Sequence, residues 1–145
     1  MSSRTAILIV EDEAIIGMAL STAVRFGGGE VVGPAASVKA ALTLLATHSV
    51  AGAILDVQLA DGLVSPLVKY LTNRNIPLII QTGGDIPYEL AAEFPDVIVR
   101  MKPNFSQSLV GELLGLIRDG RPSTTSLPAA FNSKSMPDRN GAERQ

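Results

Sequence analysis

Five short apolar runs recur along the chain, and they constrain its fold more than any other feature. They are Ala6–Val10, Val31–Ala35, Ala51–Leu55, Pro77–Ile80 and Val97–Met101. Most of these runs are continuous rather than alternating, which is typical of strands covered on both faces in a parallel sheet. Stretches with helical spacing separate them. The sequence therefore predicts an α/β domain with a doubly wound, five-stranded parallel sheet.

The helical stretches between the runs differ in strength. Apolar residues recur at helical spacing after the first run, after the second run and after the last, and Ser37 is a plausible N-cap for the second helix. Leu63–Asn73 carries Pro66, which a helix tolerates only in its first turn. Asp85–Phe94 is short and contains Pro87. We therefore expect the fourth helix to be short or irregular.

The end of the chain differs in character from the rest. The last helical stretch is predicted to stop near Asp119, and residues 121–145 are rich in Ser, Pro, Asn and charge without periodicity. We predict one domain over residues 1–120 and a disordered tail over residues 121–145. Such a tail is too short for a DNA-binding module, so we expect the domain to act without an output domain.

Composition excludes several classes of site. The chain has no cysteine and one histidine, His48, so thiolate catalysis, Cys-based metal sites and Ser-His triads lack their parts. The net charge of −2 argues against a nucleic-acid partner. No signal pattern precedes the first run, and no apolar run approaches the roughly 20 residues that span a bilayer. We expect a cytoplasmic protein without membrane contact.

Polar residues follow four of the five predicted strands. Glu11, Asp12 and Glu13 follow the first, Asp56 the third, Thr82 the fourth and Lys102 the last. In open α/β sheets, ligands bind outside the carboxyl ends of the strands. The sequence therefore predicts that carboxylates, a hydroxyl and an ammonium meet at one edge of the sheet.

The acidic residues suggest a metal. Glu11, Asp12 and Asp56 would repel one another at close range, and a hard divalent cation such as Mg²⁺ relieves that repulsion. Acidic residues after the first strand could instead stabilise the start of a helix. That alternative does not explain Asp56, which should be nearly buried at its strand end and needs a partner.

Lys102 and Thr82 also have ordinary explanations. Lys102 could be a surface lysine with a buried stem, and Thr82 could be a common strand residue. Their occurrence in register with the carboxylates, at the ends of neighbouring strands, favours a shared site. Lys102 could pair with Asp56, and Thr82 could hydrogen-bond a phosphoryl oxygen.

Four motifs make the chain resemble a known family. They are residues 7–13 (ILIVEDE), 54–62 (ILDVQLADG), 79–83 (IIQTG) and 101–103 (MKP). Together they resemble the receiver domains of bacterial response regulators, the chemotaxis-type domains of two-component signalling, over roughly residues 5–119. The resemblance implies a flavodoxin-like sheet with strand order 2-1-3-4-5.

The resemblance also implies a role for each site residue. Asp56 matches the phosphoacceptor, which attacks a phosphohistidine on a sensor histidine kinase or phosphotransfer protein. The implied Mg²⁺ ligands are Glu11, Asp12, Asp56 and the backbone carbonyl of Gln58. Thr82 matches the switch hydroxyl and Lys102 the lysine that binds the phosphoryl group. The Lys102–Pro103 peptide bond is expected to be cis.

Two positions depart from the family pattern: Glu11 stands where Asp is commoner, and the larger departure is Val99. Val99 stands where the family usually has Tyr or Phe, a ring that turns inward as the switch hydroxyl moves. A valine cannot make the same rotation. We hypothesise that the switch relies instead on Thr82 and on repacking of the fourth helix.

These features predict a single-domain response regulator that signals by binding an unidentified downstream protein. Its only chemistry would be its own phosphorylation and dephosphorylation, so it would not be an enzyme. In this family the face built by the fourth and fifth helical segments and the last strand commonly binds targets or forms dimers, which suggests a homodimer through the last strand and last helix. Two alternatives are a receiver-like interaction module that is never phosphorylated and a phosphatase with an aspartyl nucleophile. Such phosphatases need a second acid where this chain has Gln58.

Overall fold

The predicted strands form one parallel sheet, in the order β2-β1-β3-β6-β7. In the computed structural model, which describes residues 4–119, the strands are β1 (Ala6–Val10), β2 (Glu30–Ala35), β3 (Gly52–Asp56), β6 (Leu78–Thr82) and β7 (Ile98–Met101). Counted as the five predicted strands, this is the order 2-1-3-4-5, which confirms the predicted fold class. The proposed tail, residues 121–145, lies outside the described residues.

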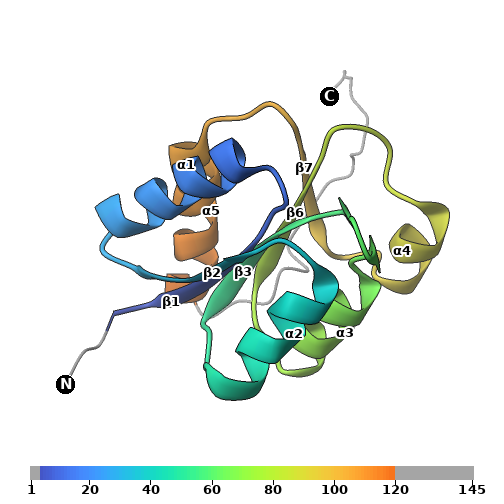
Figure 1. Ribbon diagram of the computed structural model, residues 1–145, viewed down its shortest axis with the longest axis horizontal. Helices are drawn as coiled ribbons and strands as arrows, with labels where there is room; N and C mark the ends of the chain where they lie inside the picture. Colours follow the sequence, from blue (N-terminus) through green and yellow to red (C-terminus); the bar gives the residue numbers. More distant parts are fainter. Residues whose placement is uncertain (1–3, 120–145) are drawn as a thin grey trace, which may run out of the picture.

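Helices cover both faces of this sheet (Figure 1). On one face lie α1 (Ala14–Phe26) and α5 (Ser106–Asp119), which contact each other, and on the other lie α2 (Val38–Thr47) and α3 (Ser65–Asn73). The short helix α4 (Tyr88–Glu93) buries Leu90 in the apolar cluster beneath α2 and α3. Within the described range, no helix has the length and apolar character needed to cross a bilayer.

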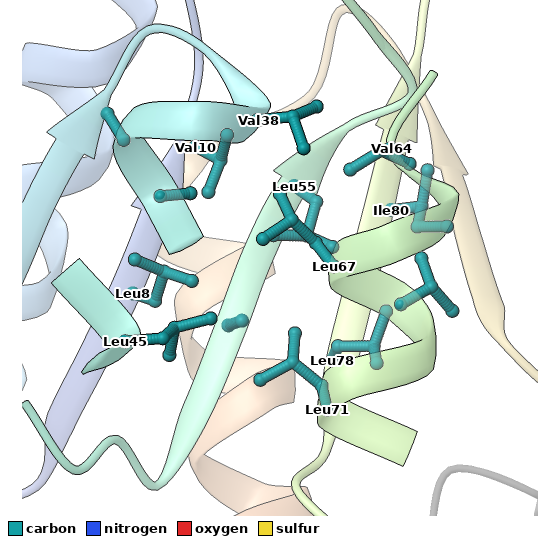
Figure 2. Packing of buried hydrophobic residues seen from close by; sticks show 14 of the residues in the cluster. Leu8, Val10, Val38, Leu45, Leu55, Val64, Leu67, Leu71, Leu78 and Ile80 are labelled. Atoms are coloured by element: carbon teal, nitrogen blue, oxygen red, sulfur yellow. The ribbon is translucent and has the colours of Figure 1, made fainter. Parts of the chain in front are cut away.

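Side chains of each strand alternate between two apolar clusters. Leu8, Leu55 and Ile80 pack toward α2 and α3, where Leu45, Leu67 and Leu71 meet them (Figure 2). Their strand neighbours Ile7, Ile9, Ile54 and Ile79 pack with Leu20, Leu109 and Leu113 of α1 and α5 instead. Because both faces are buried, the strands read as continuous apolar runs in the sequence.

Local signals in the sequence set the starts of the helices. The hydroxyl of Ser37 accepts a hydrogen bond from the Ala40 N–H at 3.0 Å, so Ser37 is the N-cap that the sequence predicted. Pro66 lies in the first turn of α3, where its missing N–H costs nothing. The fourth helix has six residues, which confirms the expectation of a short one.

A small hairpin between β3 and α3 was not predicted. It consists of β4 (Gln58–Leu59) and β5 (Gly62–Leu63), which pair antiparallel. Gly62, the first residue after the turn, has a φ of +138°, a backbone conformation that favours glycine. The Asp61 carboxylate at the tip accepts hydrogen bonds from the backbone N–H groups of Val38 (2.9 Å) and Lys39 (3.0 Å). Asp61 thus fastens the hairpin to the N-terminus of α2.

Candidate functional site

The carboxyl ends of β1, β3, β6 and β7 bring polar residues together inside an otherwise apolar protein. Residues 4–119 contain five buried polar or charged side chains: Glu11, Ser21, Asp56, Gln81 and Thr82. All except Ser21 lie at this edge of the sheet. Burying such groups is costly unless they find partners, so their concentration at one edge marks it as the candidate site.

The carboxylates of Glu11, Asp12 and Asp56 converge, because each offers an oxygen within 4.8 Å of the others. The Glu11 side chain is fully buried, and its Oε2 accepts a hydrogen bond from the Glu13 N–H at 3.1 Å. Asp56 Oδ1 accepts one from the Val57 N–H at 2.8 Å. Burial raises the pKa of Glu11, and the nearby charge of Asp56 raises it further, whereas the bond from Glu13 and the Lys102 ammonium lower it.

Lys102 reaches into this cluster from the end of β7. Its Nζ lies 3.2 Å from Asp56 Oδ2, 3.2 Å from Glu11 Oε1 and 3.7 Å from the exposed carboxylate of Glu13. Burial would lower the pKa of Lys102, but the charges and hydrogen bonds of Asp56 and Glu11 outweigh it, and the pKa is raised. The ammonium therefore stays charged between two carboxylates.

The residues present fit a divalent cation. One ammonium faces the three carboxylates of Glu11, Asp12 and Asp56, so negative charge remains in excess. Glu11 Oε1 is buried and accepts no hydrogen bond from the described residues, although it lies near Lys102 Nζ. Hard carboxylate oxygens of this kind are the ligands that Mg²⁺ prefers. Gln58 begins β4, two residues after Asp56, and its side chain is exposed.

The Thr82 hydroxyl is turned toward its own loop. It donates to the Gly84 carbonyl at 3.0 Å and accepts from the Gly84 N–H at 3.1 Å. The backbone of Thr82 is tied to the site, because its carbonyl accepts from the Lys102 N–H at 2.8 Å. A Cβ added at Gly83 or Gly84 would meet nothing within 4 Å, so open space borders this loop.

Two further predicted positions lie on β7 and just beyond it. Val99 pairs with Ile80 and packs, half-buried, against the cluster beneath α2 and α3. The Lys102–Pro103 peptide bond is cis. A second cis bond, Gly33–Pro34 in β2, was not foreseen.

Sequence reasoning missed Gln81. Its Cα pairs with those of Asp56 on β3 and Arg100 on β7, and the residue is only 3% exposed. Its amide Nε2 has no hydrogen-bond partner among the described residues. An unsatisfied buried donor of this kind costs about 1–3 kcal/mol. The available signal was a polar residue directly after the apolar run Pro77–Ile80 and before Thr82.

Comparison with known proteins gives the family. No protein-family model and no curated protein matches the sequence. Among solved structures, SdrG from Sphingomonas melonis Fr1 is 32% identical, with a TM-score of 0.66 over 81% of this chain and 99% of that one. The receiver domain of the PhyR response regulator from Erythrobacter litoralis is 26% identical, with a TM-score of 0.64 over 86% of this chain and 97% of that one.

A third structure supports the fold. The CheY-like response regulator receiver domain protein from Methanospirillum hungatei JF-1 has a TM-score of 0.72 at 24% identity, over 81% of this chain and 97% of that one. These likenesses agree with the strand order of the sheet. The chain belongs to the CheY-like receiver domains of response regulators.

Proposed function

We propose that this receiver domain accepts a phosphoryl group on Asp56 from a phosphohistidine of a sensor histidine kinase or phosphotransfer protein. One observation carries the proposal. The Lys102 ammonium lies 3.2 Å from Asp56 Oδ2, beside a cluster of three carboxylates whose charge it only partly neutralises. Phosphoryl transfer requires such positioning and charge neutralisation more than covalent help from the protein.

The chemistry assigns Asp56 as the nucleophile. A carboxylate oxygen of Asp56 forms a bond to phosphorus while the bond from phosphorus to the imidazole nitrogen breaks, and that nitrogen then takes up a proton. Lys102, already between Asp56 and Glu11, is placed to pair with an oxygen of the transferred group. Glu11, Asp12, Asp56 and the Gln58 carbonyl would hold Mg²⁺, which supplies further positive charge when bound.

The signal would leave the site through Thr82. Its hydroxyl, now bonded to Gly84, would turn to a phosphoryl oxygen and draw the loop before α4 with it. Val99 offers no aromatic ring to rotate, so the change would rest on this loop and on α4. The altered surface would then be read by a downstream protein.

The test is phosphorylation by a small donor. We would incubate the protein with Mg²⁺ and acetyl phosphate and follow its intact mass. The expected result is a single added phosphoryl group, dependent on Mg²⁺ and absent from Asp56→Ala. A protein that gains no adduct would be an interaction module that is not phosphorylated. Sustained turnover of phosphate esters would identify a phosphatase instead.

A further inference from the structure

Gln81 is a buried amide at the candidate site to which the proposed reaction gives no role. It is 3% exposed, and its Nε2 has no acceptor among residues 4–119. Buried amide donors almost always find a partner, and one left without an acceptor calls for an explanation. Its neighbours across the sheet provide one.

The alternation of side chains places Gln81 on the same face as Asp56. In β6, Ile79 packs with the α1 and α5 cluster and Ile80 with the opposite one, so Gln81 projects toward α1 and α5. In β3, Ile54 and Leu55 alternate in the same way, which puts Asp56 on that face too. Asp56 and Gln81 are also Cα partners. Their side chains therefore lie next to each other on adjacent strands.

Lys102 must cross β6, the strand of Gln81, to reach its partners. The sheet order places β6 between β7, which Lys102 follows, and β3, which ends at Asp56. Two strand spacings are about 10 Å, and the lysine bridges that interval to bring Nζ to 3.2 Å from Asp56 Oδ2. Gln81, the residue of β6 that pairs with Asp56, therefore lies on the strand that the lysine stem crosses.

The two oxygens of Asp56 already have other donors. Oδ1 accepts from the Val57 N–H at 2.8 Å, and Oδ2 faces Lys102. In this structure the Gln81 Nε2 donates to neither oxygen of Asp56 and finds no other acceptor among residues 4–119. A phosphoryl group on Asp56 would add three acceptor oxygens beside it.

We propose that Gln81 is a phosphoryl-binding residue whose buried amide donates a hydrogen bond to the phosphoryl group on Asp56, and that this donor stays unpaired in the resting protein. The inference rests on the proposed function, because the acceptor exists only once Asp56 carries the group. It assigns the site a donor on β6, between Asp56 and Lys102.

The test compares the wild type with Gln81→Leu, which keeps the size of the side chain and removes the amide. Thermal unfolding, followed by far-ultraviolet circular dichroism, is recorded with Mg²⁺ at increasing concentrations of beryllofluoride, an anion that mimics an aspartyl phosphate. The unfolding midpoint without the anion reports the stability of the resting protein. The rise of the midpoint with beryllofluoride concentration gives the dissociation constant of the anion. We expect the resting midpoint of Gln81→Leu to equal or exceed that of the wild type. The dissociation constant should rise about tenfold or more.

Gln81→Met serves as a second variant, because an unbranched side chain avoids a misfit specific to leucine. Equal affinity in the wild type and both variants would overturn the proposal. A lower resting midpoint in both variants would overturn it as well, since the amide would then be paired before phosphorylation. A wild-type protein that does not bind beryllofluoride would refute the proposed function and this inference together. Binding by the wild type with unchanged affinity in the variants would refute this inference alone.

Discussion

Two segments leave neighbouring strands at the site, and they are held very differently. Residues 57–64 follow β3 and Asp56, while residues 83–94 follow β6 and Thr82. In the first segment Val57, Leu59 and Val64 are buried, and Asp61 binds the start of α2. The second segment contains the short helix α4, which buries only Leu90 and leaves Tyr88 83% exposed.

The two segments suit two different tasks in the proposed switch. The hairpin segment holds the main chain next to Asp56 in a fixed position, which suits a group that must be aligned for transfer. The α4 segment makes few contacts, so a small change in hydrogen bonding at Thr82 can alter its position. In the proposed switch, which has Val99 in place of a rotating ring, the signal would pass through this segment.

The largest expected effect compares a buried leucine in each region. Leu67 of α3 is fully buried beside the hairpin, and Leu67→Ala should lower the free energy of unfolding by about 3 kcal/mol. Leu90→Ala should cost about half as much, roughly 1.5 kcal/mol, because the loosely held α4 can collapse into the space. Urea unfolding measures both. An equal or larger loss of unfolding free energy in Leu90→Ala would mean that α4 is held as firmly as the hairpin region.

The second prediction concerns the response to a phosphoryl mimic. With Mg²⁺ and beryllofluoride, amide hydrogen exchange should slow by about tenfold in residues 83–94, which corresponds to about 1.4 kcal/mol, and stay unchanged in residues 58–64. Thr82→Ala should bind the anion and lose most of this slowing, whereas Thr82→Ser keeps a hydroxyl and should retain it. Slowing confined to the hairpin would contradict the division of tasks.

The smallest effect concerns the fastening of the hairpin. Hydrogen bonds from the backbone N–H groups of Val38 and Lys39 lower the pKa of Asp61. Because the folded pKa lies below the unfolded value of about 3.9, the charged carboxylate stabilises the fold above that pH. The contribution is lost as the pH falls through the lowered folded pKa. Asp61→Asn should therefore lower the melting midpoint at pH 7 and have little effect at acid pH.

Ser37→Ala is the matched control for this experiment, because Ser37 caps the same helix without charge. This substitution should lower the free energy of unfolding by about 1 kcal/mol at every pH. The difference in melting midpoint between the wild type and each variant is measured from pH 7 down to acid pH. It should shrink toward acid pH for Asp61→Asn and stay constant for Ser37→Ala. A pH-independent loss for Asp61→Asn would mean that its charge does not fasten the hairpin.

Some elements of the fold could be predicted from the sequence, and others could not. The strands were located to within one or two residues, because strands buried on both faces are continuous apolar runs. The hairpin escaped prediction because its strands have two residues each, too few for a period. The partners of Asp61 lie more than twenty positions earlier in the chain, where no local pattern could indicate them.

The candidate site divides in the same way. The sequence placed Glu11, Asp12, Asp56 and Lys102 at one edge because strand ends in a parallel sheet meet there, and the structure brings them together. Gln81 was visible at the end of the fourth apolar run, but its burial and missing partner depend on packing across three strands. The turn of the Thr82 hydroxyl toward Gly84 is likewise a matter of loop geometry.

We propose that Asp56, and no other carboxylate of the cluster, carries the phosphoryl group. The most direct measurement treats the phosphorylated protein with borohydride, which reduces an aspartyl phosphate to homoserine, and locates the product by peptide mass spectrometry. We predict homoserine at position 56 alone, and only after incubation with Mg²⁺ and acetyl phosphate. Reduction at Glu11 or Asp12, or an unmodified Asp56 in a protein that has gained a phosphoryl group, would show that Asp56 is not the phosphoacceptor.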